Sequence, residues 1–276
     1  MTVLAALVRA YGRLAERGEA PRSGYSVEKI SYVIPLHPDG TVAGFPIDWR
    51  IREKNKKLPR QIAVPQPPKR TSGIASNFLW DKTAYALGVT AGEGKRLIAE
   101  HAEFVDRHLS ALSEATDEGL VALRLFIEGW RPENFVRLGW PEEMKDQNVV
   151  FALESDRLQN VMIHDREAAI NLWIRTQSAG DRSEAICLVT GEYGPIARLH
   201  PSIKGVRGAQ SQGASLVSFD GDAFKSYGHD QGDNAPVSEA ATFAYTTALN
   251  RFLAYGSTNR IQIGDASTVC TEMVIG

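Results

Sequence analysis

Two stretches of the chain repeat their apolar residues at the spacing of an amphipathic helix. Residues 2–17 carry an apolar stripe composed of Val3, Leu4, Leu7, Val8, Tyr11 and Leu14. Residues 93–115 carry a second stripe composed of Leu97, Ile98, Phe104, Val105, Leu109 and Leu112. Because one face of each stretch is apolar and the rest is polar, we expect two surface helices that pack against a core.

Capping residues predict further helices. Asp117 is placed to cap a helix that runs through Trp130, and Pro132 suits the first turn of the next one. Asp165 is expected to cap a helix through Thr176. A last helix should extend from Ser238, its N-cap, to residue 253, since a carboxylate follows the cap in the first turn.

Strand signals are concentrated before residue 92. Residues 27–36 predict a strand, the turn sequence His37-Pro38-Asp39-Gly40 follows, and residues 41–47 predict a returning strand. Further short strands are predicted at residues 61–64, 84–89, 148–153, 186–190 and 215–219. The expected fold class is therefore α+β, with mixed small sheets and packed helices. We expect a β-rich region over residues 1–92, then a helical stretch and a second mixed region over residues 93–276.

Composition limits the class of protein. The chain has 276 residues, of which 43% are apolar and 23% are charged, as in ordinary soluble globular proteins. The net charge is −2, so any surface for nucleic acid must be local. The only two cysteines, Cys187 and Cys270, lie far apart without metal-ligand spacing, which favours a reducing cytoplasm. Apolar runs are too short to span a membrane, and charges such as Arg9 and Arg13 argue against a signal peptide.

Cations are crowded between residues 50 and 60, where a single acid, Glu53, opposes them. These cations are Arg50, Arg52, Lys54, Lys56, Lys57 and Arg60. Lysine and arginine neutralise phosphates, so this arm is a candidate contact for a nucleic-acid backbone. A solvated surface hairpin is the structural alternative.

The segment Pro65–Asp81 follows the basic arm and predicts a polar loop stiffened by prolines at its start. Lys69 and Arg70 can neutralise phosphates, and the hydroxyls of Thr71 and Ser72 can bind phosphate oxygens. Asn77 carries a donor and an acceptor that could read a base edge. Asparagine also often caps turns, and that structural role is the alternative for Asn77.

A second polar loop is predicted over residues 199–234, and it is glycine-rich. Lys204 and Arg207 can hold a phosphate chain, while Gln210 and Gln212 can bond bases or wedge into a strand separation. A long surface loop without function is the alternative, although loops of this length in compact chains are usually functional or disordered.

Catalytic patterns are weak throughout the chain. Two histidine–aspartate pairs, His164-Asp165 and His229-Asp230, occur in the sequence, and His101 and His108 could share a helix face. A metal-dependent nuclease requires further ligands that converge on the same metals. We therefore expect no catalytic residues, no metal and no cofactor, and we keep a metal-dependent nuclease as the alternative activity.

Several ordered blocks of the sequence resemble one family. They are Val64–Ile74 with Asn77-Phe78-Leu79, Cys187–Glu192, His200–Val206, Gly213–Phe219, Tyr227-Gly228, Asn234–Glu239 and Tyr245–Asn250. On these blocks the chain resembles the large subunit of the type I-C CRISPR Cascade surveillance complex. The match extends over nearly the whole chain and fades after Val269.

The resemblance implies a non-catalytic, cytoplasmic subunit that recognises the protospacer-adjacent motif in double-stranded DNA. Base pairing with the guide RNA then reads the remaining sequence. The implied partners are the crRNA-containing Cascade backbone, the subunits that bind the crRNA ends, the target DNA, and a separate helicase–nuclease that receives the R-loop. On this resemblance we also expect that the helical C-terminal half of the family is missing from the sequence. A module that only scaffolds other subunits is a further alternative.

Overall fold

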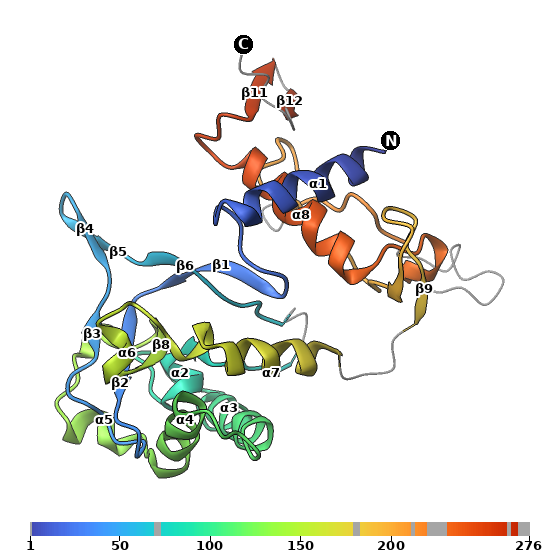
Figure 1. The fold of residues 1–276 in the computed structure, drawn as a ribbon. Coiled ribbons are helices and arrows are strands. Elements are labelled where there is room, and N and C mark those ends of the chain that lie inside the picture. Colours follow the sequence, from blue (N-terminus) through green and yellow to red (C-terminus); the bar gives the residue numbers. More distant parts are fainter. Residues whose placement is uncertain are drawn as a thin grey trace. The chain divides into compact units, whose positions relative to one another are not determined.

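In a computed structural model, the chain adopts a mixed α+β fold with several small sheets (Figure 1), which confirms the predicted fold class. The structure describes residues 2–68, 73–178, 183–210, 213–219, 231–263 and 266–269. The chain forms two compact units. The central unit is Gly24–Ala179, and the terminal unit combines Met1–Ser23 with Gly180–Gly276. The expected division of roles at residue 92 stays a prediction.

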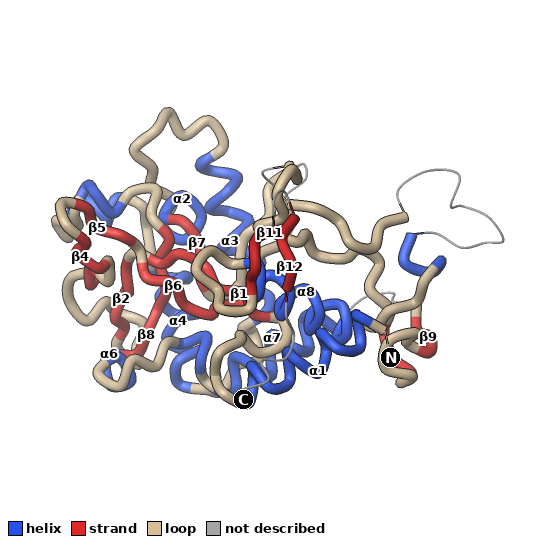
Figure 2. Tube along the Cα trace, turned by 90° about the horizontal axis from the view of Figure 1, so that it is seen from above, coloured by secondary structure: helices blue, strands red, loops and turns tan. Residues whose placement is uncertain are grey.

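A four-stranded sheet forms the centre of the central unit, with the strand order β3-β2-β8-β7. Strands β2 (Tyr32–Leu36) and β8 (Asn148–Leu153) are parallel, in a register that runs from Tyr32 opposite Val149 to Leu36 opposite Leu153. The edge strands β3 (Ile47–Asp48) and β7 (Trp80–Lys82) are antiparallel to their neighbours. These strands are red in Figure 2.

Both faces of this sheet are buried, which explains why its middle strands are apolar without interruption. On one face, Ile34 and Phe151 join a core that also contains Leu123 and Phe126. On the other face, Val33 and Val150 join a smaller core. Consecutive residues of a strand point to opposite faces, so each strand contributes to both cores.

Helices contribute most of the larger core of the central unit. They are α2 (Thr83–Ala86), α3 (Leu97–Ala111), α4 (Glu118–Gly129), α5 (Glu133–Arg137), α6 (Glu154–Arg157) and α7 (Glu167–Ser178), with short 3-10 turns at Glu142–Met144 and Ile163–Asp165. The predicted cap of α4 is confirmed, because the Leu120 N–H donates to the Asp117 carboxylate at 3.1 Å. Arg166 donates to the same carboxylate and thereby links α4 to the start of α7.

Two antiparallel ribbons complete the central unit. One pairs β1 (Tyr25–Ile30) with β6 (Arg60–Pro65), and the other pairs β4 (Ile51–Glu53) with β5 (Lys56–Leu58). The inner face of the first ribbon covers the smaller core through Ile30 and Val64. The second ribbon extends away from helices α2 to α5 (Figure 1).

In the terminal unit, α1 (Val3–Glu16) and α8 (Glu239–Leu253) lie side by side in both views (Figures 1 and 2). Their apolar faces form a core that includes Leu7, Leu14, Tyr245 and Phe252. The predicted cap Ser238 is confirmed, since its hydroxyl accepts from the Ala241 N–H at 3.2 Å. The remaining elements are β9 (Glu184–Ile186), β10 (Tyr193–Pro195), a 3-10 turn at Gln231–Asn234, β11 (Arg260–Ile263) and β12 (Ala266–Val269).

Some predicted strands are wrong or shortened. Residues 84–89 do not form a strand, because helix α2 occupies their start and the Leu87 N–H donates to the Thr83 carbonyl at 2.9 Å. A fully buried apolar run has no polar face, so its periodicity does not distinguish a strand from a helix. Residues 215–219 also lack a strand. Ser31 divides the predicted strand at 27–36 into β1 and β2.

The predicted turn at residues 37–40 is confirmed by two backbone hydrogen bonds. The His37 N–H donates to the Thr41 carbonyl at 2.8 Å, and the Gly40 N–H donates to the His37 carbonyl at 2.9 Å. The returning strand is shorter than predicted, because only β3 and an isolated bridge between Leu36 and Val42 remain of it. Within the described ranges, no helix is both long enough and apolar enough to cross a bilayer.

Candidate nucleic-acid interface

The basic arm forms the β4–β5 hairpin, and every residue from 51 to 58 is exposed. Its strands place Arg52 opposite Lys57 and Glu53 opposite Lys56. Lys54 begins the two-residue turn with φ +53°, a conformation that costs a residue with a side chain about 1–2 kcal/mol. The hairpin therefore presents its cations on a narrow, solvated ribbon.

Three of these cations are available to a ligand. Within the part of the chain that the structure describes, the side chains of Arg52, Lys54 and Lys56 form no hydrogen bond or ion pair. Because none of them forms an ion pair with a carboxylate of the described residues, they concentrate positive charge on a protein whose net charge is −2. Because the protein as a whole is nearly neutral, it could bind a polyanion only through a local positive surface of this kind.

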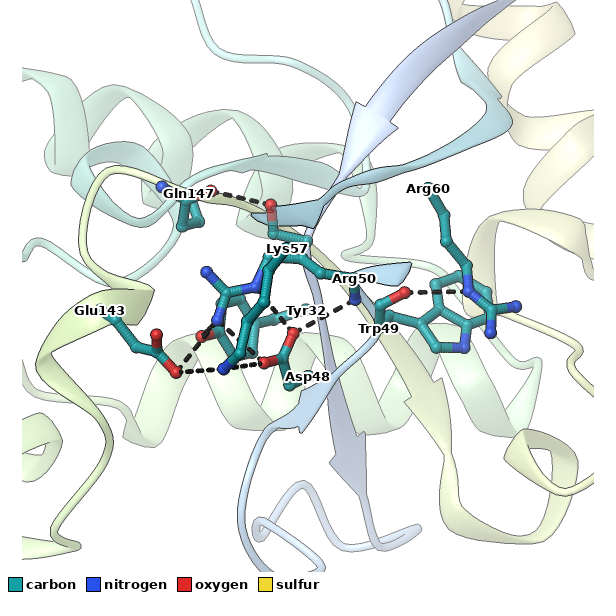
Figure 3. A network of polar contacts seen from close by, with 9 residues as sticks. Tyr32, Asp48, Trp49, Arg50, Lys57, Arg60, Glu143 and Gln147 are labelled. Atoms are coloured by element: carbon teal, nitrogen blue, oxygen red, sulfur yellow. Dashed lines mark hydrogen bonds and ion pairs between the residues drawn. The ribbon is translucent and has the colours of Figure 1, made fainter. Parts of the chain in front are cut away.

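A network of ion pairs fixes the base of the hairpin (Figure 3). The Arg50 guanidinium donates to both oxygens of Asp48, at 2.7 and 2.8 Å, and to the Tyr32 hydroxyl at 2.6 Å. Arg50 also contacts the Glu143 carboxylate at 3.0 Å. The Lys57 ammonium lies between the same two carboxylates, at 2.9 Å from each. The network thus joins the hairpin to β2, β3 and the turn that contains Glu143.

The pKa values of the network follow from these contacts. The hydrogen bond from Arg50 holds the pKa of Asp48 well below its usual range, and the same bond raises the pKa of Arg50. Hydrogen bonding to Asp48 raises the pKa of Lys57, while the Lys57 bond lowers that of Glu143. Burial raises the pKa of Tyr32 to about 12. All four charged groups of the network therefore stay ionised at neutral pH.

Lys57 and Arg60, two predicted phosphate contacts, already have partners within the protein. Lys57 is shared by two carboxylates, which also offsets its repulsion from Arg52 across the ribbon. Arg60 donates from Nε to the Trp49 carbonyl at 2.9 Å, and its guanidinium carbon lies 5.2 Å from the centre of the Trp49 ring. Lys56 is the predicted contact of this hairpin whose side chain forms no hydrogen bond or ion pair with a described residue.

Asn77 lies in the same unit but is buried, with 4% of its surface exposed. Its backbone N–H donates to one oxygen of Asp81 at 2.8 Å, and its side-chain amide donates to the other at 3.2 Å. A buried, bonded amide organises a turn, which is the structural alternative kept for this residue. Its role as a base reader stays a prediction.

The second polar loop lies in the terminal unit, and a bridge closes its first part, between residues 203 and 214. Ile203 and Ala214 form an isolated bridge with two hydrogen bonds, of 2.8 and 2.9 Å. Ile203 is buried against α1 and α8. Asn250 of α8 accepts from the Lys204 N–H at 2.7 Å and donates to the Ser202 carbonyl at 3.2 Å. The described residues Lys204, Arg207 and Gln210 are exposed on this anchored loop.

Two glycines of this loop offer a matched test of its fixed geometry. Gly205 and Gly208 both have positive φ, of +76° and +80°. A Cβ on Gly205 would lie 2.9 Å from the Leu253 carbonyl oxygen, whereas one on Gly208 would meet no described atom within 4 Å. We expect Gly205→Ala to loosen the loop base and Gly208→Ala to cost only the backbone strain of about 1–2 kcal/mol.

Hydrogen exchange of the amides of residues 203–214 measures this difference. Exchange should accelerate markedly in the Gly205→Ala variant and much less in the Gly208→Ala variant. Equal acceleration in both variants would mean that the contact with α8 does not hold the loop.

The structure places the predicted site residues in two groups, one in each unit. Lys56, Lys57, Arg60 and Asn77 belong to the central unit, and Lys204, Arg207 and Gln210 belong to the terminal unit. The other predicted contacts, Lys69, Arg70, Thr71, Ser72 and Gln212, lie outside the described residues.

The described histidines do not form the metal site that a metal-dependent nuclease would need. His164 is buried, His101 bonds to the Tyr85 carbonyl, and His108 is buried in the core of the central unit. Across the described ranges, no group of three His, Cys, Asp or Glu residues could hold a metal ion. The pair His229-Asp230 and Cys270 lie outside those ranges, while Cys187 is buried and its sulfur accepts from the Ser238 N–H at 3.2 Å.

The sequence analysis did not identify the two carboxylates that form ion pairs with the basic arm. Asp48 precedes the arm and pairs with it across a short turn, so the acid before the arginine is a local signal that could have been used. Glu143 is far away in the chain, and no sequence pattern connects it with Lys57. The most informative contacts of the hairpin are therefore tertiary.

Comparison with known proteins identifies the family of the chain. The family model described as "CRISPR-associated protein (Cas_Csd1)" matches residues 7–271, which is nearly the entire chain. A search of the curated proteins finds no match. The chain belongs to the Cas_Csd1 family, the large subunits of type I-C CRISPR Cascade complexes.

Proposed function

We propose that this subunit recognises the protospacer-adjacent motif in duplex DNA and helps to open the duplex. Its partners would be the crRNA-containing Cascade backbone, the subunits that bind the crRNA ends, and a separate helicase–nuclease that acts on the R-loop. The subunit itself would be non-catalytic. Membership of a Cascade family supplies the general role, and the β4–β5 hairpin is the observation that supports direct DNA binding.

The shape and charge of the hairpin suit a DNA groove. The major groove of B-DNA admits a two-stranded β-ribbon, and β4–β5 is such a ribbon, exposed along its whole length. Arg52, Lys54 and Lys56 would contact phosphates, which set the position of a protein on DNA without reading sequence. Motif reading is assigned to the loop between β6 and β7, and duplex opening to the loop that carries Lys204, Arg207 and Gln210.

The availability of each cation predicts how much its removal matters. Lys56→Ala, tested in the assembled complex, should weaken binding to all duplexes alike and reduce the salt slope by about one unit. Lys57→Ala should reduce the slope by less, because Asp48 and Glu143 already offset that charge. Lys95→Ala, which removes an exposed lysine paired with Glu93, should leave the slope unchanged.

Titration of labelled duplexes at several salt concentrations measures these slopes. If Lys56→Ala keeps the wild-type affinity at every salt concentration, the hairpin does not bind DNA. The same result with charge reversal at Arg52, Lys54 and Lys56 together would favour the scaffolding alternative.

A further inference from the structure

The tip of the β4–β5 hairpin consists of two residues, Lys54 and Asn55. The strand pairing ends with Glu53 opposite Lys56, so the turn between them contains no other residue. Both turn residues are exposed, and so are all residues of the two strands. The hairpin extends away from helices α2 to α5 (Figure 1), so a side chain at its tip lies at the far end of the ribbon.

The side chain of Asn55 has no structural partner among the described residues. Asparagine and aspartate in turns often accept a hydrogen bond from the backbone two residues further on. Asp39 and Asp48 do so in this unit, where they accept from the N–H groups of Thr41 and Arg50 at 2.9 and 3.2 Å. The Asn55 amide forms no hydrogen bond with a described residue. Its donor and its acceptor are therefore both available to a ligand.

The order of the two turn residues does not favour the turn itself. Lys54 has a φ of +53°, whereas Asn55 does not have a positive φ. The left-handed region suits glycine or asparagine better than lysine, and glycine is the usual first residue of a hairpin turn of this kind. Strained residues of this type concentrate at functional sites. Here the strained residue places an ammonium group beside the Asn55 amide.

The dimensions of the ribbon fit the major groove of B-DNA. Each strand has 3 residues, which at about 3.3 Å per residue gives a reach of about 10 Å. The major groove is about 12 Å wide and about 8.5 Å deep, whereas the minor groove is only about 6 Å wide. Two paired backbones alone lie about 4.8 Å apart, so the ribbon with its side chains enters only the major groove of undistorted DNA. The tip then reaches the base edges.

The cations of the hairpin suit the walls of that groove. Arg52, Lys54 and Lys56 have long side chains that form no ion pair with a described carboxylate, and they outnumber the single acid, Glu53. Contacts with phosphates position a protein on DNA without reading its sequence. The cations would therefore hold the ribbon in the groove, and the short side chain between Lys54 and Lys56 would face the bases.

We propose that Asn55 is a specificity-determining residue that contacts the edge of one adenine in the major groove. This inference rests on the proposed function, and it adds a base contact to those assigned to the β6–β7 loop. An asparagine amide donates to N7 of adenine and accepts from its N6 amino group. No other base presents this pattern of acceptor and donor in the major groove.

Substitutions at Asn55 test the proposal in the assembled complex. The complexes are offered a duplex library in which every position beside the guide-matched target is randomised. Asn55→Ala should reduce the preference for adenine at one position by about tenfold, the order of one lost bidentate contact. Preferences at the other positions and the salt slope should not change. Asn55→Gln should keep the preference, because glutamine offers the same donor and acceptor.

Asn160→Gly is the matched control. Asn160 is another exposed asparagine of the central unit, and glycine accepts its φ of +57° without strain. This variant should leave the preference at every position unchanged. If it reduced the adenine preference as much as Asn55→Ala does, the effect would not come from the hairpin tip and the proposal would be overturned.

A modified duplex tests which groove is read. Deazaadenine, in which a C–H group replaces N7, is placed at the position where Asn55→Ala loses its preference. N7 faces the major groove, so this change should lower the affinity of the wild-type complex severalfold. It should not change the affinity of the Asn55→Ala complex, which has already lost the contact. Unchanged affinity in the wild-type complex would overturn the proposal.

Other outcomes separate this proposal from the proposed function. Wild-type preferences in the Asn55→Ala complex would overturn the proposal, as would an equal loss of affinity for all sequences. Failure of Asn55→Ala to assemble would also overturn it, because the tip would then contact a neighbouring subunit. If the wild-type complex shows no motif preference and Lys56→Ala keeps the wild-type salt slope, the proposed function fails. If both controls behave as expected and Asn55→Ala changes nothing, only the reading role of Asn55 fails.

Discussion

The central unit should lose stability as the pH falls below about 6.5, because the imidazole of His108 is buried in its neutral form. Burial lowers the pKa of this imidazole from 6.5 to about 3. Between these values the unfolded chain binds a proton that the folded unit does not bind, so acid favours unfolding. The expected slope is about 1.4 kcal/mol per pH unit, which amounts to about 2 kcal/mol at pH 5. Above pH 6.5 the histidine contributes no slope.

The distribution of tryptophan makes this measurable in the intact chain. All five tryptophans of the sequence lie between residues 24 and 179, so their fluorescence reports unfolding of the central unit alone. Urea unfolding curves at pH 8, 6 and 5 are compared between wild type and His108→Gln, which has no titrating group at this position. The difference between the two proteins isolates the histidine.

Carboxylates titrate in a lower window and do not obscure the effect. The pKa values of Asp48 and Glu143 are lowered from 3.8 and 4.5, so the stability that they contribute is lost only below these values. A wild-type curve with the same pH dependence as the glutamine variant between pH 8 and 5 would contradict the assignment of a buried, neutral His108.

Local signals account for the elements that sequence analysis predicted well. The caps Asp117 and Ser238 make the hydrogen bonds expected of them, because a cap bonds to a backbone N–H only three residues away. The turn at residues 37–40 follows in the same way from the identity of four adjacent residues. The stripe of residues 2–17 predicts α1 correctly because its apolar face is continuous.

Tertiary contacts account for what could not be predicted. The run at residues 84–89 is apolar on every side, and only its packing decides that it starts as a helix. Asn77 lies in a polar segment, which predicts an exposed side chain. In the structure it is buried, and its amide donates a hydrogen bond to Asp81. Lys57 and Lys56 are adjacent in sequence, and Lys57 is the paired one because the fold places its ammonium between Asp48 and Glu143. Composition therefore predicts the basic region, and the fold decides which of its cations are paired within the protein.

Replacing Arg50 by methionine should have the second large effect, on both stability and DNA binding. The Arg50 side chain is 10% exposed and bonds to Asp48, Tyr32 and Glu143. Its removal leaves the two carboxylates close together with only Lys57 between them. Hydrogen bonds to charged groups contribute about 1.5–3 kcal/mol each, so we expect a loss of about 2–3 kcal/mol after allowing for solvent at the carboxylates.

Arg52→Met is the matched control, because it makes the same chemical change two residues further along the hairpin. Arg52 is exposed and has no partner among the described residues, so its loss should change the free energy of unfolding by less than about 0.5 kcal/mol. It should still weaken DNA binding by one phosphate contact. Unfolding is followed by tryptophan fluorescence, and DNA binding by the salt dependence of affinity in the assembled complex.

Variants of the two arginines should therefore distinguish residues that hold the hairpin in place from residues that contact DNA. Arg50→Met should lower both stability and DNA affinity, and its loss of affinity should exceed that of Arg52→Met, because a ribbon without a fixed base must be ordered on binding. Arg52→Met should lower affinity alone. If both variants were equally stable and bound DNA equally, the ion-pair network would not position the hairpin. The cations would then act only through their number, as they would on a flexible basic tail.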